Sequence, residues 1–323
     1  MKIGIIGTGM SGLSCARHLH EGGVACELFD KGRRPGGRMA SRVNDDRSSF
    51  DHGAQYFTAR SDAFLRVVEE GVRAGAVAEW TARFGEYDGA TLAPKASPQL
   101  TRYVGTPTMN NWPRVLAQGL NFAQSFHVQT IDRDDDGWWL TNRDGTRRGP
   151  YDWLVVTAPA EQAADLLSGT RLEATLRSVQ FAPSHAVLAS WDAPLDVVYD
   201  GLFVNSGPLS WVARNTSKPG RPDRESWVLH SQGSWSLENW DQDGEWLTET
   251  LVAAFAGLPF SPDPPSEASL HRWKYAIPQP LEERYLVDLR EKVICAGDYC
   301  GGPKVEGAFL SGLAAADQIL TAQ

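Results

Sequence analysis

The stretch KIGIIGTGMSG, residues 2–12, decides the fold of this chain. It begins with a short apolar run, Lys2–Ile6, of the kind that forms a buried strand. The glycines that follow fit the pattern G-x-G-x-x-G at Gly7, Gly9 and Gly12. In such a loop the first glycine permits a tight turn, the second lets a pyrophosphate approach the backbone, and the third lets the next helix pack on the sheet. The stretch therefore predicts a strand, a loop and a helix that bind a dinucleotide.

The residues after this loop complete a β-α-β unit. We predict a helix over Leu13–Glu21, ended by two glycines, and a second strand over Val24–Phe29. Asp30 stands at the end of that strand, where an acid accepts hydrogen bonds from a ribose diol. A lone glycine pattern is a weak signal, and a plain strand-to-helix turn is the other interpretation. The strand, the helix and the acid together favour dinucleotide binding.

A second glycine loop, PGGRM at residues 35–39, follows this acid. Its two glycines let backbone come close to a ligand. Its cation, Arg38, is suited to pairing with phosphate. An exposed turn with a solvated arginine is the alternative. Its position after Asp30 favours FAD over NAD as the dinucleotide.

The end of the sequence returns to the same α/β pattern. The run Val293–Ala296 predicts a strand, and Asp298 follows it next to a glycine, at a place where α/β folds bind ligands. That carboxylate is suited to a ribityl hydroxyl. The helix that we predict over Gly307–Leu320 can either stabilise negative charge on a reduced flavin or serve only as a structural element. The FAD site is thus predicted to be closed by the end of the sequence.

Composition excludes several classes of function. The chain has 323 residues and a net charge of −9, with no run of more than two consecutive Lys or Arg, so nucleic acid is not an expected partner. The spacing of its four cysteines fits no zinc signature, so we expect no metal site. No stretch is apolar for long enough to span a membrane. Few cysteines and no signal-peptide pattern predict a cytoplasmic protein.

The pattern of elements predicts two domains of class α/β plus α+β. We expect a Rossmann-like FAD-binding domain of glutathione-reductase type, interrupted by an inserted, mainly antiparallel β substrate domain. The FAD-binding domain would comprise residues 1–60, 105–165 and 285–323, and the substrate domain residues 61–104 and 166–284. The other predicted elements are helices Ser61–Gly75, Asn111–Leu120, Glu161–Leu167 and Trp240–Phe255, a β-meander within residues 126–147, and strands Trp153–Thr157, Ala186–Trp191, Gly201–Val204, Leu209–Arg214 and Ser226–Ser231.

Five segments together resemble the flavin amine-oxidase superfamily. They are GTGMSG (7–12), GGRMASR (36–42), DHGAQYF (51–57), ICAGD (294–298) and VEGAFLSG (305–312). Within that superfamily, WVARNTSKP (211–219) and HRWKYA (271–276) are most similar to renalase and its bacterial relatives. The resemblance covers nearly the whole chain, and its flavin motifs are specific as a set.

The resemblance implies a non-covalent FAD, because Cys300 does not match the usual context of a flavin-linking cysteine. Residues 51–57 would run beside the isoalloxazine ring, and Val128 would lie near the adenine. The implied FAD contacts are Gly7, Gly9, Met10, Ser11, Gly12, Asp30, Lys31, Gly36, Gly37, Arg38, Met39, Gly53, Ala54, Gln55, Val128, Gly297, Asp298, Val305, Glu306, Gly307 and Ala308.

The resemblance also implies a reaction. Renalase-like proteins oxidise dihydro isomers of NAD(P)H that are reduced at the 2 or 6 position, pass the hydride to flavin, and use O₂ as the electron acceptor. Such hydride transfer needs positioning and a dry aromatic slot more than an acid or a base. The flavin itself would do the chemistry, and the substrate-site candidates are Gln55, Tyr56, Asn215, Trp273 and Tyr275.

Other interpretations stay open at this stage. They are an amine oxidase or desaturase-like enzyme of the same fold, a flavin-binding module without turnover, and an NAD-dependent dehydrogenase. Amine oxidases of the superfamily typically carry a lysine near flavin N5, and neither Lys274 nor Lys304 can be placed there from the sequence. Arg214, Asn215 and Lys218 fit either a substrate contact or a solvated loop, and each tryptophan fits a core position as well as a substrate contact.

Overall fold

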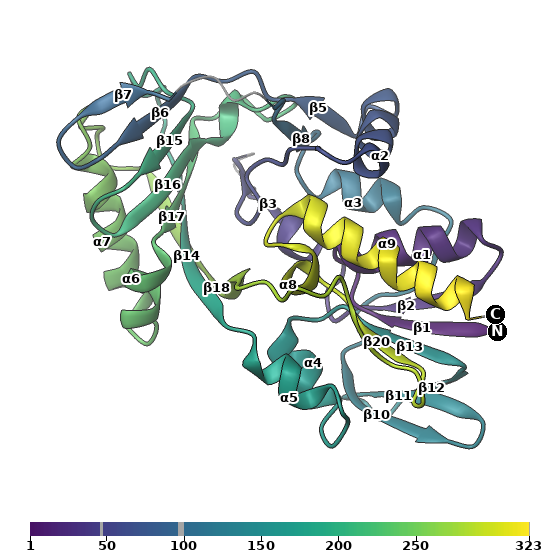
Figure 1. The fold of residues 1–323 in the computed structure, drawn as a ribbon. Helices are drawn as coiled ribbons and strands as arrows, with labels where there is room; N and C mark the ends of the chain where they lie inside the picture. Colours follow the sequence, from purple (N-terminus) through teal and green to yellow (C-terminus); the bar gives the residue numbers. More distant parts are fainter. Residues whose placement is uncertain (46–47, 96–99, 323) are drawn as a thin grey trace.

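Three β-sheets organise the chain. The computed structural model describes residues 1–45, 48–95 and 100–322. Figure 1 shows two lobes, one around a six-stranded sheet that carries both termini and one around a seven-stranded sheet. The third sheet has three strands and packs against the six-stranded one, since Trp138 and Leu140 share a core with Leu154 and Val156.

The six-stranded sheet contains the predicted β-α-β unit. Its strands, in spatial order, are β19 (Leu286–Asp288), β20 (Val293–Cys295), β13 (Trp153–Val156), β1 (Lys2–Ile6), β2 (Ala25–Phe29) and β9 (Asn121–Ala123). All neighbours are parallel except the edge strand β19. Parallel strands need a crossover, and α1 (Met10–Glu21) supplies the one between β1 and β2. The carboxyl ends of β1 and β2 therefore lie at one edge, beside the glycine loop.

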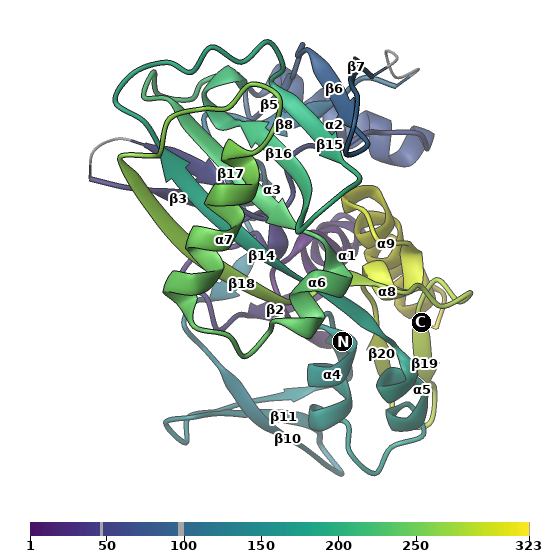
Figure 2. The same ribbon diagram turned by 90° about the vertical axis from the view of Figure 1, so that its left-hand side faces the viewer.

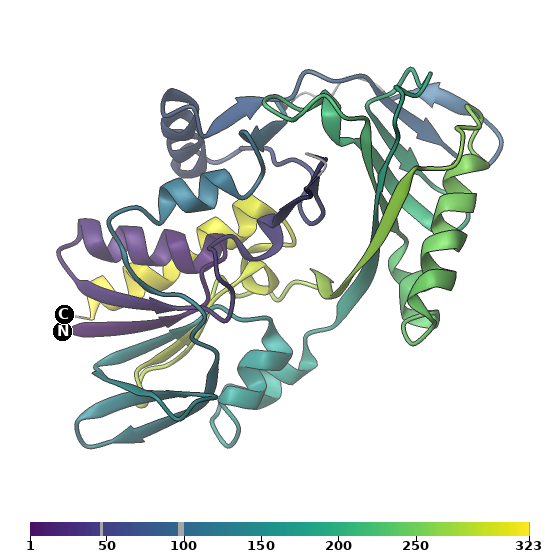
Figure 3. The same cartoon turned by 180° about the vertical axis from the view of Figure 1, so that it is seen from behind.

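Helices α1 and α9 (Val305–Thr321) pack together on one face of this sheet, as Figures 1 and 3 show from opposite sides. Ser14 Oγ donates a hydrogen bond to Phe309 O at 2.9 Å. A Cβ atom added at Gly312 would come within 2.0 Å of Ser11 O. Glycine is therefore required where the helices cross. This crossing joins the two ends of the sequence.

The other face of the sheet is covered by the predicted meander. Its strands are β10 (Val128–Asp134), β11 (Gly137–Asn142) and β12 (Arg147–Tyr151), all antiparallel. Two short helices follow β13: α4 (Ala160–Leu166) and α5 (Glu173–Ser178).

The seven-stranded sheet carries helices on its outer face only. Its strands, in spatial order, are β18 (Glu267–Pro278), β14 (Phe181–Ser190), β17 (Ser226–Ser231), β16 (Leu209–Arg214), β15 (Gly201–Val204), β6 (Phe84–Tyr87) and β7 (Leu92–Pro94). Helices α6 (Gly233–Glu238) and α7 (Gly244–Ala256) lie on the side turned away from the first lobe (Figures 1 and 2). The inner face is left for other contacts.

Alternation along these strands decides which side chains face inward, because successive side chains in a strand point to opposite faces. Val212 and Leu229 pack outward in the core that contains Phe255 of α7. Their neighbours Trp211 and Val228 belong to the inner clusters. The period-2 spacing along these strands thus determines which aromatic side chains lie on the inner face.

Short elements connect the two lobes. They are η1 (Gly37–Met39), β3 (Ser41–Val43), β4 (Ser49–Asp51), α2 (Asp62–Arg73), β5 (Val77–Glu79), β8 (Tyr103–Gly105), α3 (Asn111–Leu116), η2 (Asn215–Ser217) and α8 (Asp298–Gly301).

Three predicted helices have bounds that differ by three residues or more, and one long strand was not predicted. The helix predicted over Leu13–Glu21 begins at Met10. The predicted helix Trp240–Phe255 begins only at Gly244, because the Asp243 carboxylate caps its N-terminus by accepting from the amides of residues 245 and 246. The predicted helix Asn111–Leu120 ends at Leu116. Strand β18 contains residues 271, 273 and 275, and their alternation with exposed polar residues is the signal that marks this strand.

The strands separate as the expected domain boundaries require. All strands of the six-stranded sheet fall in 1–60, 105–165 and 285–323, and all of the seven-stranded sheet in 61–104 and 166–284. We retain these boundaries as a proposal. Among the described residues, no helix is long and apolar enough to cross a membrane. No group of three His, Cys, Asp or Glu side chains suited to a metal ion occurs within 1–45, 48–95 and 100–322.

Candidate functional site

The glycine loop after β1 leaves room for a ligand. Gly7 has a φ of 107°, which favours glycine. Gly9 is the N-cap of α1 and makes no side-chain cap, so the first amides of the helix are free for an anion. A Cβ atom built on Gly9 meets no heavy atom within 4 Å. The hydroxyl of Ser11 is buried and has no partner within the described parts of the chain. These features fit a pyrophosphate.

The second glycine loop packs directly on the first. The Asp30 carboxylate accepts hydrogen bonds from Thr8 N at 2.8 Å and Thr8 Oγ1 at 2.6 Å. It also accepts from Gly32 N at 2.7 Å. A Cβ on Gly37 would lie 3.3 Å from Gly9 Cα. Asp30 thus holds the two loops together. Its carboxylate has further lone pairs that can accept hydrogen bonds from a ribose.

The other predicted contacts around these loops differ in exposure. Met10 and Met39 are buried in the core under α1, whereas Lys31 and Gly37 are exposed. Val128 is buried in the same hydrophobic cluster as Phe29, and Phe29 is the residue that precedes Asp30 in the sequence.

Arg38 joins three of the predicted segments. Its guanidinium donates to both carboxylate oxygens of Asp298, with Nη1 at 2.8 Å from Oδ2, and to Ala276 O at 2.9 Å. Its carbonyl accepts from Ala54 N at 2.8 Å, and a Cβ on Gly53 would overlap that carbonyl. The sequence suggested a phosphate partner for Arg38 and did not predict the pair with Asp298. The pair neutralises both groups at the junction of the two lobes.

The N-terminus of α9 completes this junction. Lys304 is its N-cap and makes no side-chain cap, so the amides over Val305–Ala308 have no side-chain acceptor there. Glu306, in the first turn, is turned to the protein and accepts from Arg60 N at 3.1 Å and Ser61 N at 2.7 Å. Gly307 lies against α8, where an added Cβ would meet Gly302 O at 2.1 Å.

Asp51 is the centre of a buried charge network. One of its oxygens accepts from Ser41 Oγ at 2.8 Å and Met109 N at 2.9 Å. The other accepts from Arg221 Nη2 at 2.5 Å and Lys218 Nζ at 3.2 Å. All three charged side chains are fully buried. The two cations hold the pKa of the Asp51 carboxyl well below its usual range, although burial alone would raise it.

The lysine of this network is also held by two neutral acceptors. Lys218 Nζ donates to Gln55 Oε1 and Asn215 Oδ1, both at 3.1 Å. The side-chain amide nitrogen of Asn215 donates a hydrogen bond to Ser49 O at 2.6 Å. Burial lowers the pKa of Lys218 to about 8, against the opposing charge of Asp51. The structure therefore excludes the solvated-loop interpretation for Asn215 and Lys218.

His52, next in the chain, belongs to an inward cluster of rings. It stacks on Trp273 with ring centroids 5.3 Å apart, and Trp273 Nε1 donates to His52 O at 2.7 Å. His271 lies 4.5 Å from the His52 ring, and His230 Nε2 is 3.0 Å from His52 O. Burial lowers the pKa of His52 to about 3, so its ring is neutral in the folded protein. Tyr275 instead packs on Phe181, 5.4 Å away.

Stability should fall as the pH drops below 6.5. Burial lowers the pKa of His185 and His230 to about 4, and that of His52 to about 3, from 6.5. Below pH 6.5 the unfolded chain binds these protons and the native chain does not. Each histidine therefore removes about 1.4 kcal/mol of stability per pH unit between pH 6.5 and its native pKa. Urea unfolding at several pH values measures how the free energy of unfolding changes with pH. His185→Phe should reduce that slope by the contribution of one bound proton. A flat profile from pH 7 to 5 would contradict these shifts.

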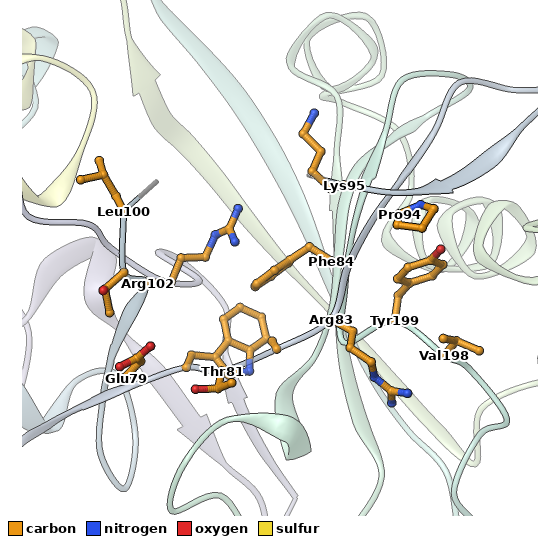
Figure 4. A pocket seen from close by; sticks show the side chains of 13 residues that line it. Glu79, Thr81, Arg83, Phe84, Pro94, Lys95, Leu100, Arg102, Val198 and Tyr199 are labelled. Carbon is orange, nitrogen blue, oxygen red and sulfur yellow. The ribbon is translucent and has the colours of Figure 1, made fainter. Parts of the chain in front are cut away.

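Tyr56 leads from this region to a cavity. Its ring lies 5.7 Å from Trp211, 6.3 Å from Trp80 and 6.4 Å from Phe84. Trp80 and Phe84 line a cavity of about 560 Å³ between β6 and the segment before β8. Figure 4 shows this cavity with the side chain of Arg102 reaching toward Phe84. The sequence indicates Tyr56 as a candidate but neither Trp80 nor Arg102, because nothing in the local pattern places residues 80–84 beside residue 56.

The lysines considered for flavin N5 lie outside this arrangement. Lys274 is exposed and pairs with Glu161 at 2.9 Å, and Lys304 is exposed at the start of α9. Most tryptophans of the second lobe are also placed elsewhere: Trp227 packs on Phe255 in the outer core, and Trp235 stacks on Trp246 between α6 and α7. Trp211 and Trp273 face inward.

Comparisons with known proteins agree with this geometry. Residues 5–70 match a family described as NAD(P)-binding Rossmann-like domain. Residues 81–320, more than half of the chain, match the family described as flavin containing amine oxidoreductase.

Three solved structures share the fold at low identity. A protein from Exiguobacterium assigned as a protoporphyrinogen oxidase has 13% identity and a TM-score of 0.81, over 100% of this chain and 99% of that chain. Reduced UDP-galactopyranose mutase has 14% identity and a TM-score of 0.79, over 100% and 94%. Wild-type putrescine oxidase bound to putrescine has 13% identity and a TM-score of 0.74, over 99% of each chain. The Rossmann-like fold with free loop amides, together with the family match, leads to one conclusion: the chain belongs to the flavin containing amine oxidoreductase family and is a FAD-dependent oxidoreductase.

Proposed function

We propose that this protein oxidises dihydro isomers of NAD(P)H that are reduced at the 2 or 6 position, giving NAD(P)⁺ and hydrogen peroxide. When bound, FAD supplies the hydride acceptor and, through O₂, the route to peroxide. The chain's own task is then to bind the substrate, hold its ring against the flavin and exclude water. These tasks suit a site that is rich in aromatic side chains and poor in unpaired acidic or basic groups.

FAD would be held non-covalently by the cradle described above. The supporting observations are the free amides at the start of α1, the open space over Gly9 and the unpartnered hydroxyl of Ser11. The thiol of Cys300 is buried, which raises its pKa to about 12 and keeps it protonated and unreactive. The proposed contacts are those implied by the resemblance, with Arg38 and Asp298 acting as a pair rather than singly.

The charge of the cavity beyond Tyr56 carries the proposal. Arg83 and Lys95 line it but pair with Asp200 and Glu86, and the acid Glu79 lines it too. The cation that acts on a ligand there is Arg102, which forms no ion pair among the described residues. A protonated amine would be repelled there, whereas the phosphates of a dinucleotide would be attracted. The planar walls, Trp80 and Phe84, suit a nicotinamide or adenine ring.

The polar network beside the proposed flavin position supports hydride transfer without a base. Lys218 already donates to three acceptors, and His52 is neutral. We propose that Tyr56 and Trp273 contact the substrate and that Gln55 and Asn215 position the flavin-adjacent segment. Tyr275, which packs on Phe181, would contribute at the margin of the site.

A steady-state peroxide assay tests the proposal. The FAD-loaded protein is given 2- and 6-dihydro-NAD(P)H, ordinary 4-dihydro-NAD(P)H and a panel of primary and secondary amines. We expect peroxide with the 2 or 6 isomers and little with the amines, because the unpaired guanidinium of Arg102 would repel a protonated amine. Peroxide from an amine alone would reverse the assignment.

Amine oxidation or a desaturation is the second candidate, since the family description names amines. It would need an uncharged substrate beside Arg102 in the cavity. Its signature would therefore be activity that rises with pH as the amine loses its proton, and no dependence on dihydronicotinamides.

A further inference from the structure

Arg102 is a buried cation that has no counter-ion among residues 1–45, 48–95 and 100–322. Its side chain is only 8% exposed, and Nη1 is buried without a hydrogen-bond partner. Within the described parts of the chain, no carboxylate forms an ion pair with it. The residues outside that description are 46–47, 96–99 and 323, and residue 46 is the one acid among them. An isolated buried charge is costly unless something pairs with it.

Aromatic rings hold this guanidinium in place. Its central carbon lies 3.8 Å from the centre of the Phe84 ring and 5.0 Å from that of Tyr56. The backbone is fixed as well, because Trp80 N donates to Arg102 O at 2.8 Å. Cation–π contacts recover part of the cost of burial and orient the planar fork, but they use none of its N–H donors. The donors are thereby kept for a ligand.

The other two cations of the cavity are already neutralised. Lys95 pairs with Glu86 at 2.5 Å, and Arg83 Nε lies 3.8 Å from Asp200. Arg83 is also 63% exposed at its side chain, so solvent screens its charge. Glu79 also lines the cavity but forms no ion pair with Arg102. Among the described residues, Arg102 is therefore the cation of this cavity that has no ion-pair partner, and it is the one that Figure 4 shows beside Phe84.

We propose that Arg102 is the anion-binding residue of the substrate cavity. Its fork would bind two oxygens of a phosphate or a carboxylate, while a ring attached to that anion lies against Trp80 or Phe84. This inference rests on the proposed function only in assigning the cavity to the substrate. The inference adds that Arg102 is the residue that recognises the substrate. The group that it recognises is an anionic oxygen group attached to a planar ring.

Equilibrium binding to the FAD-loaded protein tests this without turnover. Inorganic pyrophosphate, benzoate and neutral benzamide are titrated by calorimetry at constant ionic strength into the wild type, Arg102→Met and Arg102→Lys. We expect one or both anions to bind about 10- to 100-fold more weakly to Arg102→Met. Arg102→Lys should lose less, since it keeps the charge but not the fork. Benzamide binding should not change.

Arg66→Met is the matched control, because it removes an equal charge from an exposed position in α2. It should leave all three affinities unchanged. Loss of pyrophosphate binding alone would identify a phosphate-bearing substrate, and loss of benzoate binding alone a carboxylate. The inference is overturned if neither anion binds the wild type, or if both bind Arg102→Met as tightly. If anion binding depends on Arg102 but no dihydronicotinamide is oxidised, the proposed function fails and this inference stands.

Discussion

Asp51→Asn should destabilise the protein by about 3–5 kcal/mol, the typical cost of leaving buried charges without their partner. Lys218 and Arg221 would both remain fully buried and lose their shared carboxylate. An amide of the same size keeps the packing but offers one acceptor oxygen and no charge. The flavin-adjacent segment should loosen too, since Gln55 and Asn215 are held through Lys218.

Urea unfolding of the FAD-loaded protein measures this effect. The matched control is Glu291→Gln, which breaks an ion pair with Arg133 at the surface, where the two side chains are 44% and 33% exposed. That control should cost less than about 1 kcal/mol. Adding Lys218→Met to Asp51→Asn should recover part of the loss, because it removes one unpaired charge. Equal effects of Asp51→Asn and Glu291→Gln would show that the network does not contribute as described.

Gly9→Ala should abolish most FAD binding while leaving the fold intact. The added Cβ meets no protein atom within 4 Å, so the apoprotein has no reason to distort. The same Cβ would enter the space where a pyrophosphate approaches the loop. Overpacking of about 1–3 kcal/mol corresponds to about 5- to 150-fold weaker FAD binding.

Flavin titration of the apoprotein gives the affinity, and circular dichroism with thermal melting reports on the fold. Gly244→Ala, at the start of α7, is the control, because its Cβ would meet only Leu270 Cδ2, at an ordinary van der Waals distance of 3.9 Å. It should leave FAD affinity unchanged. If Gly9→Ala bound FAD like the wild type, the glycine loop would not carry the dinucleotide.

The cofactor half of the molecule could be predicted from the sequence because its signals are local. The strand, glycine loop, helix and acid lie within residues 2–30, and spacing alone orders them. Strands Gly201–Val204, Leu209–Arg214 and Ser226–Ser231 were also predicted with the bounds that the structure gives. Alternation with turn residues on either side is enough to find such strands.

The substrate half could not be predicted to the same depth, because its contacts join distant residues. Asp51 meets Lys218 and Arg221 only after the seven-stranded sheet has folded over β4. Arg102 comes to lie over Phe84 because the chain returns from β7 toward β8. Neither burial nor the lack of a partner can be read from the local sequence around residue 102.

The most direct test of the central claim is the visible spectrum of the purified, FAD-loaded protein, recorded anaerobically before and after 6-dihydro-NAD is added. We expect a yellow protein whose flavin band bleaches on mixing and returns with peroxide when air is admitted. A flavin band that stays unchanged with the 2 and 6 isomers, yet bleaches with an amine, would contradict it.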